Sequence, residues 1–474
     1  MSIGYAPELA ARPGRRNLPL ANSGFVAIGI CLLGIEFLIA DLGERFFYEV
    51  DFARAPIVFY VGLFLAAGLV YLPLRWLIPR LSPSGYLLVT LILIGLLARM
   101  LLFGSNPILE IDHYRYLWDG AVVANGFSPY ALPPAAVPGS DLSMLATQAG
   151  AVFERINYRD LSTIYPPLAQ ALFALAYWLD AWQPDGLRLL LLIADLSTLF
   201  LILKILRRLN YSPYWVCLYW WNPLLITLTY NALHMDALLL PFLMAALWLL
   251  IRQKPVAACG ALTLAAGIKL WLLLLLPFAL RNLLDSPRQL LAACGVILIV
   301  ASVSIAPMLI LWPGDHSGLA AFSQQWERNS ALFPQLVNLL SMVSASPGLH
   351  ARILVAIAIT LLVFYLLRDP VSDPPTLIRN ITITIAVLFL LSPVQLPWYC
   401  LWLLPFLCFY PHPALLLLST LMPIYFLRFH FDFRGQAEIF DQWIVWIQYL
   451  PPLLLIIARG RYRLAFTNQV PRHV

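Results

Sequence analysis

Charged residues are scarce in this chain. Of its 474 residues, 11% are Asp, Glu, Lys or Arg, whereas 61% are hydrophobic. An average soluble domain carries about 25% charged and about 45–50% apolar residues, so there are too few charges here to cover a water-exposed surface of this size. The composition argues against a soluble enzyme, a disordered chain and a nucleic-acid-binding protein. It favours a protein that crosses a membrane many times.

Paired cysteines and repeats are lacking as well. The six Cys all lie in apolar stretches and none forms a Cys-x-x-Cys pair, so the sequence predicts neither a disulfide framework nor a zinc site. No low-complexity tract or clear repeat is present. Proline, by contrast, is abundant, with 37 residues. In a membrane protein this abundance predicts kinked or broken helices, whose freed carbonyl groups are satisfied by neighbouring helices.

Long apolar runs dominate the chain instead. At about 20 residues per crossing, we expect an all-α transmembrane bundle of about 13 spans, some of them broken. Residues 1–474 should form one integral membrane domain, with a long outer loop that bears short interfacial helices. The runs are Asn22–Ala40, Ala55–Leu72, Ser84–Phe103, Tyr165–Leu179, Leu187–Leu206, Tyr214–Tyr230, Met235–Leu250, Pro255–Leu280, Leu290–Leu311, Ala351–Leu367, Ile378–Leu391, Trp398–Phe409, Ala414–Phe426 and Trp443–Ala458.

Clusters of basic residues indicate the sidedness. Arginines without nearby acids occur before the first apolar run, at 207–208 and in the C-terminal tail. By the positive-inside rule, these segments and both termini should face the cytoplasm, with the protein in the plasma or inner membrane. The acid-rich segments 41–51 and 104–162, and a second loop at about 313–349, should lie on the outer face, in the periplasm or at the cell exterior.

Two stretches do not fit a simple alternation of spans. The runs Tyr165–Leu179 and Leu187–Leu206 both lie between the outer loop and the cytoplasmic arginine pair, where an odd number of crossings is required. One of these two runs should therefore not cross the membrane completely. The run Pro255–Leu280 is long and carries Gly267 and Lys269 near its middle, a pattern that fits two half-helices.

The segment 104–162 carries the densest set of reactive side chains and holds six of the 24 acids. In an extended stretch Glu110 and Asp112 would share one face. Asp112, Arg115 and Asp119 are spaced three and four apart, so they would share one face of a helix that began near Asp112. Aromatic residues are interleaved with these charges. They fit a sugar site, but a membrane-anchoring belt or a solvated loop with an ordinary salt bridge would show the same composition.

The stretch from Asp112 to Tyr130 resembles the first outer loop of membrane glycosyltransferases of the GT-C superfamily. More narrowly, it resembles bacterial mannosyltransferases that depend on polyprenyl-phosphate mannose. Glu110-Ile111-Asp112 is similar to the acidic "modified DxD" motif of that loop, although the loop here follows the third apolar run rather than the first. Further matches follow in order at Thr163–Leu168, Asn222-Pro223, Asn231/His234/Asp236, Gly267–Lys269, Trp326–Asn329, and Ser392-Pro393 with Pro397–Tyr399.

A reaction scheme follows from these residues and the resemblance. A polyprenyl phosphate is a good leaving group, whereas the acceptor hydroxyl needs a base, and Asp112 is our candidate for it. The outcome would be inversion. Lys269 is the first candidate for the leaving phosphate because an ionisable group at membrane depth is a functional hypothesis by default. We expect sugar contacts from Glu110, Asp119, Trp118, Tyr165 and Trp398, and further phosphate contacts from Arg115, His234 and Arg328.

Three of these roles have plain structural alternatives. Asp119 could be a helix-start or turn residue before Gly120. Lys269 could sit at a helix break and extend its ammonium group to water. His234 could be an oriented histidine at a helix start, where Asp236 would favour the positive end of the helix dipole.

Cofactor use is left open. Glu110, Asp112 and Asp236 are possible ligands of a divalent ion, but nothing in their spacing brings them together. No other cofactor is expected, and membrane lipids are the expected surroundings. The expected function is transfer of a sugar, mannose by the resemblance, from a polyprenyl-phosphate donor to a lipid-linked or polysaccharide acceptor at the outer face. The sequence does not decide the sugar or the acceptor.

Two other classes of protein would share this hydropathy. A lipid or sugar transporter, or flippase, would show matching halves and acids within its spans, but no halves are evident and Glu36 and Asp195 are the plainest intramembrane acids. A membrane scaffold would need neither charges at membrane depth nor an acidic outer loop.

Overall fold

The chain folds as a polytopic bundle of α-helices. The computed structural model describes residues 19–46, 55–82, 84–310, 317–368 and 373–467. Within these ranges there is no β-strand, and the one extended pairing is an isolated bridge between Arg328 and Val394. Nine described helices are long and apolar enough to cross a membrane, and a bent pair could form a tenth span. The predicted fold class is therefore confirmed.

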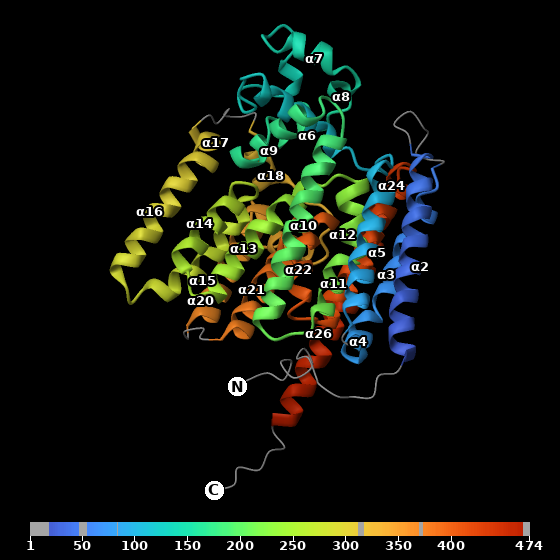
Figure 1. Ribbon diagram of the computed structural model, residues 1–474. Coiled ribbons are helices and arrows are strands. Elements are labelled where there is room, and N and C mark those ends of the chain that lie inside the picture. The colour runs from blue at the N-terminus through green and yellow to red at the C-terminus, as the bar shows by residue number, and fades with distance from the viewer. Residues whose placement is uncertain (1–18, 47–54, 83, 311–316, 369–372, 468–474) are drawn as a thin grey trace.

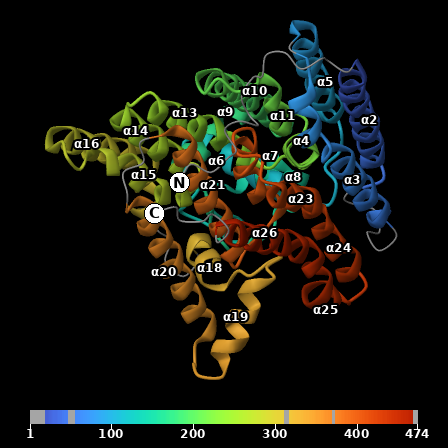
Figure 2. The same cartoon turned by 90° about the horizontal axis from the view of Figure 1, so that it is seen from below.

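The helices are best followed in two halves in Figure 1. The first half contains α2 (Pro19–Gly43), α3 (Ile57–Tyr71), α4 (Leu74–Leu77), α5 (Gly85–Phe103), α6 (Asp112–Ala124), α7 (Ser143–Ala149), α8 (Ala151–Glu154), α9 (Pro167–Leu179), α10 (Asp185–Arg208), α11 (Cys217–Trp220), α12 (Pro223–Ile226) and α13 (Leu240–Ile251). The second half contains α14 (Pro255–Ala266), α15 (Leu276–Leu280), α16 (Pro287–Ser304), α17 (Ala306–Ile310), α18 (Gly318–Gln325), α19 (Leu332–Ser341), α20 (Pro347–Leu367), α21 (Pro374–Leu391), α22 (Leu404–Leu407), α23 (Pro413–Leu421), α24 (Leu427–Asp432), α25 (Ala437–Ile439) and α26 (Val445–Thr467). Figure 2 shows α19 and α20 side by side at one edge of the bundle.

The nine long helices of the described residues account for the continuous spans, whereas about 13 spans were expected with some of them broken. Several apolar runs fold as short or broken helices because proline and polar residues interrupt them. In the run Tyr214–Tyr230, the Asn222 side chain accepts hydrogen bonds from the Leu224 and Leu225 amides at 3.0 and 3.4 Å and begins α12, with Pro223 at its first position. A π-helix, η4 (Thr227–Asn231), follows.

This broken segment nevertheless runs beside α5 for its whole length. At one end, the Tyr214 hydroxyl accepts a hydrogen bond from the Ser84 amide at 2.6 Å. At the other end, the Asn231 side chain donates to Ser105 Oγ at 2.8 Å and to the Asn106 carbonyl at 2.7 Å. The chain then bends by 109° into η5 (Met235–Leu239) and α13. The bend therefore lies at the end of α5 that leads into the 104–162 loop.

A second break splits the run Pro255–Leu280, as its sequence predicted. Helix α14 ends at Ala266, and a 3₁₀-helix, η6 (Leu270–Leu275), begins after Lys269. Gly267 is needed at this break, because a Cβ there would lie 2.6 Å from Ser304 Cβ and 3.1 Å from Leu168 Cβ. The Gly267 carbonyl accepts a hydrogen bond from the Ala169 amide at 3.2 Å, so the break is held against the start of α9.

The short run is α9, which resolves the crossing problem between the loop and Arg207. It has 13 residues and packs against α6, whereas α10 has 24 residues and is long enough to cross. Gly120 permits the close packing of α6 on α9, because a Cβ there would lie 2.3 Å from the Phe173 carbonyl oxygen. The loop 104–162 also has a small hydrophobic core of its own, which includes Trp118 and Phe153.

Figure 1 places α6, α7 and α8 together at one end of the bundle. The start of α2 and the end of α26 lie at the opposite end. Of the expected outer loop 313–349, the described part contains α18 and α19, and residues 313–316 lie outside the described ranges.

Candidate active site

Four interruptions of helical structure meet beneath α6. They are the loop before α6, the bend after Asn231, the break at Lys269, and a 3₁₀-helix, η9 (Pro397–Trp402), after α21. Each exposes backbone and side chains that a continuous helix would direct into lipid or the core. Irregular backbone at membrane depth is tolerated where it is buried in protein or lines a cavity. The four segments bring together most of the residues that the sequence pointed to.

Lys269 is held by an acid and by aromatic rings. Its Nζ lies 2.6 Å from Asp236 Oδ1, and the Trp402 indole nitrogen donates to the same oxygen at 2.7 Å. The Lys269 ammonium also lies 4.1 Å from the centre of the Tyr399 ring, within the range of a cation–π contact. The lysine side chain is 15% exposed. It therefore does not extend to open water, and its charge remains at the site.

Glu110 and His234 form a second, looser contact. Glu110 Oε2 lies 3.8 Å from His234 Nε2, and the imidazole stacks on the Trp398 indole with a centre-to-centre distance of 3.6 Å. Both side chains are buried, and neither His234 nitrogen nor Glu110 Oε1 has a hydrogen-bond partner among the described residues. Buried polar atoms are normally paired, so these atoms are suited to receive hydroxyl groups of a ligand.

Asp112 is fixed by a residue that the sequence did not point to. Its Oδ1 accepts a hydrogen bond from Asn157 Nδ2 at 2.7 Å, and Asp112 is only half-buried. Burial raises the pKa of Asp112, and Asp236 raises it further, whereas the Asn157 hydrogen bond and Lys269 lower it. The pKa of Glu110 is raised well above its ordinary value by burial and then by Asp112. Asp112, whose pKa is lowered by a hydrogen bond and by a cation as well as raised by burial, is therefore the better candidate for a base.

Left-handed backbone flanks these residues. Leu109, Leu233, Tyr158 and Asn329 have φ angles of 62°, 61°, 46° and 55°. Non-glycine residues adopt such angles rarely, and they concentrate at functional sites where the surrounding structure enforces them. Here each lies next to a side chain in the site or lines it directly. Three of these four residues thus lie in the loop before α6, the bend after Asn231 and the loop after α18, and each of these segments directs a side chain toward the site.

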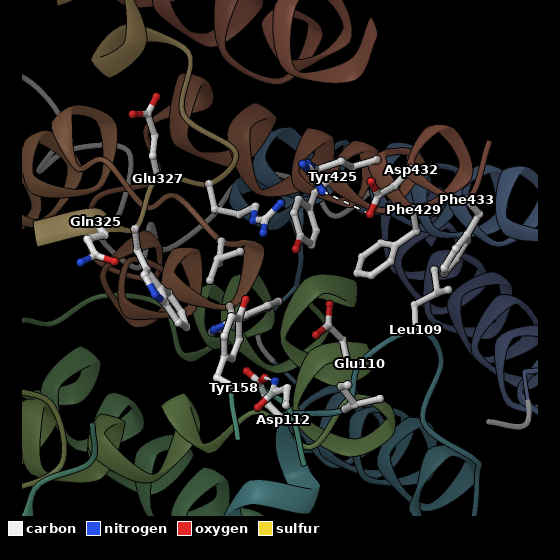
Figure 3. A pocket seen from close by; sticks show the side chains of 17 residues that line it. Leu109, Glu110, Asp112, Tyr158, Gln325, Glu327, Tyr425, Phe429, Asp432 and Phe433 are labelled. Atoms are coloured by element: carbon white, nitrogen blue, oxygen red, sulfur yellow. Dashed lines mark hydrogen bonds and ion pairs between the residues drawn. The ribbon is translucent and has the colours of Figure 1, made fainter. Parts of the chain in front are cut away.

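Three neighbouring cavities share wall residues at the site. The largest, of about 590 Å³, is lined by Glu110, Asp112 and aromatic residues in and next to α24, including Phe429. Figure 3 shows Glu110 and Asp112 entering it from the side opposite Tyr425. A mostly apolar cavity of about 190 Å³ has Lys269 in its wall. The third, of about 70 Å³, has both Asp112 and Lys269 in its wall and shares residues with each of the others. The lining thus changes from mostly apolar, through a wall that contains Lys269, to one that contains the two carboxylates.

Some of the other predicted site residues line the cavities, and the rest hold the loop 104–162 in place. Tyr165 lines the two smaller cavities. Arg115 lines the smallest, but its Nε donates to Asp119 Oδ1 at 2.9 Å. Asp119 is 1% exposed and also accepts from Gln170, and Trp118 packs on Phe153 in the core of the loop. Asp119 and Trp118 thus contact other parts of the loop and do not line any of the three cavities.

Arg328 lines the largest of the three cavities. Its backbone pairs with the segment after α21, with the Arg328 amide donating to the Pro393 carbonyl at 3.0 Å and the Gln395 amide donating to the Arg328 carbonyl at 2.9 Å. The two late motifs of the sequence are therefore neighbours. Because Arg328 lines only the 590 Å³ cavity of the three, its place favours contact with an acceptor over contact with a phosphate at Lys269.

Metal ligands do not converge in the part of the chain that the structure describes. Among these residues, no three His, Cys, Asp or Glu side chains lie together in a way that could hold an ion. Asp236 is turned toward Lys269 and Trp402. Glu110 and Asp112 remain a pair on one wall of the largest cavity.

A family model supports the interpretation of the site. The model of "Alpha-(1->6)-mannopyranosyltransferase, N-terminal domain" matches residues 23–284, more than half of the chain. The chain belongs to this family. The matched part includes Glu110, Asp112, His234, Asp236 and Lys269. The aromatic residues of η9 lie beyond it.

A relative from Mycobacterium tuberculosis (strain ATCC 25618 / H37Rv) is described as alpha-(1->6)-mannopyranosyltransferase A. It is 23% identical over 342 residues, which cover 63% of this chain and 61% of the relative. The alignment thus spans about three fifths of the relative's length. No solved structure matches the chain.

Two residues of the site were missed by sequence reasoning. Asn157 holds Asp112 from 45 positions away, and nothing around it in the loop marks it. Trp402 reaches Asp236 across 166 positions. It lies four residues after Trp398 in an aromatic run, where its indole N–H could not be told from those of the core tryptophans.

Proposed function

We propose that this protein is an inverting mannosyltransferase that uses a polyprenyl-phosphate mannose donor and a hydroxyl of a glycan or lipid-linked acceptor. One observation carries the proposal. The mostly apolar cavity shares Lys269 with the smallest cavity, which in turn shares Asp112 with the largest, so apolar wall, cation and carboxylate are neighbours in that order. That order matches the order of parts in the donor, which are a hydrocarbon chain, a phosphate and a sugar.

The donor would enter with its lipid end in the 190 Å³ cavity. This cavity is lined mainly by aliphatic and aromatic side chains, among them Trp271, Phe322 and Phe389, and it buries hydrocarbon favourably. Lys269 lies where the cavity meets the polar space, and it would hold the phosphate as a point charge. The mannose would then occupy the 70 Å³ cavity between Lys269 and Asp112.

The reaction is a single displacement. The acceptor oxygen forms a bond to the anomeric carbon and its proton passes to the Asp112 carboxylate, while the bond between that carbon and the phosphate oxygen breaks and leaves its electron pair on the phosphate. The raised pKa of Asp112 makes it a stronger base than an ordinary aspartate. Attack from the side opposite the phosphate inverts the anomeric carbon.

The acceptor would occupy the 590 Å³ cavity. Trp398, Tyr425 and Phe429 line it together with Glu110 and Arg328. Aromatic faces and a few polar groups are the usual lining of sugar sites. The unpartnered Glu110 oxygen is placed to bind an acceptor hydroxyl.

The outer face of the membrane is the proposed side of reaction. The acid-rich loop 104–162 carries Asp112, and the basic residues at 207–208 lie at the last turn of α10. Under the positive-inside rule, that arrangement directs the loop away from the cytoplasm. Residues 1–474 would then act as one integral domain, with both termini in the cytoplasm.

The test is a product analysis with purified protein. The protein is incubated with polyprenyl-phosphate mannose, glucose and arabinose and with mannose-containing acceptors, and the products are examined by mass spectrometry. We expect the acceptor to gain one hexose from the mannose donor. A protein that moves labelled donor between the leaflets of a vesicle but forms no new glycosidic bond would instead be a flippase.

A further inference from the structure

Asp236 is a charged group that the proposed transfer does not use. It is 1% exposed and lies 2.6 Å from Lys269, the proposed phosphate ligand. Its position is fixed, because Trp402 donates to it and the Trp402 ring is stacked between Tyr399 at 4.7 Å and Trp271 at 4.6 Å. Lys269, with a long flexible side chain, is the partner that can move.

The second cation at this point is paired in the same way. Arg115 and Lys269 are the cations in the wall of the 70 Å³ cavity, and Arg115 contacts the buried Asp119 at 2.9 Å. A site built only to bind phosphate as tightly as it can would leave its cations without competing carboxylates. The ion pairs Lys269–Asp236 and Arg115–Asp119 are therefore better explained by a step after binding, such as release of the product.

The phosphate gains charge during the reaction. A polyprenyl-phosphate sugar is a phosphodiester with one negative charge, whereas the leaving polyprenyl phosphate is a monoester with a charge of about −1.5 to −2 at pH 7. In a site of low dielectric, a lone lysine would bind this product more tightly than the donor. Without a countermeasure, the enzyme would be inhibited by its own product.

We propose that Asp236 is a positioning residue that competes with the phosphate for Lys269 and so speeds release of the polyprenyl-phosphate product. This inference rests on the proposed function. Because the Lys269–Asp236 pair carries no net charge when both groups are ionised, the extra charge of the product meets little extra attraction. Lys269 can return to Asp236 as the product leaves.

The test compares a monoester and a diester ligand in the full-length protein. Polyprenyl phosphate represents the product, and polyprenyl methyl phosphate represents the singly charged donor. Binding is followed by the fluorescence of the tryptophans around Lys269. In Asp236→Asn, the affinity for the monoester should rise at least about fivefold, whereas that for the diester, which carries the smaller charge, should rise only about two- to threefold. Equal changes for both ligands, or none for either, would overturn the inference.

Turnover provides a second readout that a merely structural role would not move. In Asp236→Asn, the first turnover should be followed by a slower steady state, and added polyprenyl phosphate should inhibit more strongly than it inhibits wild type. Asp236→Glu, which keeps the charge, should restore wild-type behaviour. Inhibition as weak as in wild type would contradict the proposal. In Lys269→Met, the added Asp236→Asn change should no longer alter the preference between monoester and diester.

A second variant covers the case in which Asp236→Asn does not fold. Trp402→Phe keeps the ring but removes the N–H that shares the Asp236 oxygen with Lys269, so the ion pair tightens. The preference for the monoester should then fall, and a rise would overturn the inference. If the wild type transfers no sugar from any polyprenyl phosphate, the proposed function itself fails. If it transfers sugar but these preferences do not shift, only the role of Asp236 fails.

Discussion

Asp112 and its neighbours show how single residues prepare the site. Asn157 donates to Asp112 at 2.7 Å and opposes the rise in pKa that burial causes. A general base must be ionised, so the rate should fall as the pH drops through the pKa of Asp112. The motif around Glu110 and Asp112 could be read from the sequence. Asn157 could not, because a contact between residues 45 positions apart leaves no local pattern in the sequence.

Asn157→Ala should move the acidic limb of the pH–rate profile to higher pH. Loss of the hydrogen bond removes an interaction that lowers the pKa of Asp112, so the pKa rises and the base is protonated over a wider range. The measurement is kcat/KM for transfer across about pH 5 to 9. Asn125→Ala is the control, because Asn125 bonds only the Ala121 carbonyl within the same loop. A limb that stays in place or moves to lower pH would contradict this account of Asp112.

Lys269→Met should weaken use of the donor. Methionine keeps much of the apolar stem but removes the charge, so KM for the polyprenyl donor should rise or kcat should fall by about tenfold to a hundredfold. KM for the acceptor should change little. Lys254→Met, at an exposed position, is the matched control. Unchanged donor kinetics in a stable Lys269→Met protein would assign the phosphate to Arg115, His234 or Arg328.

At the scale of elements, the site depends on where helices stop. The break at Gly267–Lys269 could be predicted from the length of its run and the glycine and lysine near its middle, whereas the break at Asn222-Pro223 fell in a run expected to be continuous. The count of crossings predicted that one of the two runs 165–179 and 187–206 would fall short, but not that it would be α9. The burial of Asp119 and Trp118 could not be predicted, because it depends on how α6 packs on α9 and on the core of the loop.

Gly120→Ala should loosen the packing of α6 on α9. The new methyl group would lie 2.3 Å from the Phe173 carbonyl oxygen, which backbone atoms cannot easily yield, and overpacking of this kind costs about 1–3 kcal/mol. Thermal unfolding in detergent should show a lower midpoint, and activity should fall because α6 carries Asp112. The control is Gly62→Ala in α3, where nothing lies within 4 Å and alanine should be neutral or stabilising. An unchanged midpoint for Gly120→Ala would contradict this packing.

At the scale of the whole molecule, the site lies where the loop 104–162 packs on the broken helices of the bundle. Helices α6, α7 and α8 lie at the end of the bundle opposite the start of α2 (Figure 1). Hydropathy was sufficient to predict an all-α membrane bundle. It did not show which of the expected spans would be broken, and apolar runs such as 398–409 fold into short helices within the bundle, η9 and α22.

The proposed sidedness can be tested by labelling. Met144 in α7 is 74% exposed, so Met144→Cys should react with an impermeant thiol reagent in intact cells. Arg208→Cys, at the C-terminal end of α10, should react only after permeabilisation. The unmodified protein, with its six native cysteines, gives the background. The reverse pattern would place the donor on the cytoplasmic side.

The most direct test of the central claim is the rate of a single turnover in purified Asp112→Asn. The protein is held in excess over labelled polyprenyl-phosphate mannose in the presence of acceptor, and the formation of the glycosidic bond is followed over time. The amide keeps the size of the side chain and can still contact Asn157, but it cannot accept the acceptor proton. The rate should fall by about 10²- to 10⁴-fold, while donor binding and the unfolding midpoint stay near wild type. A folded Asp112→Asn protein that transfers mannose at a near wild-type rate would contradict the account.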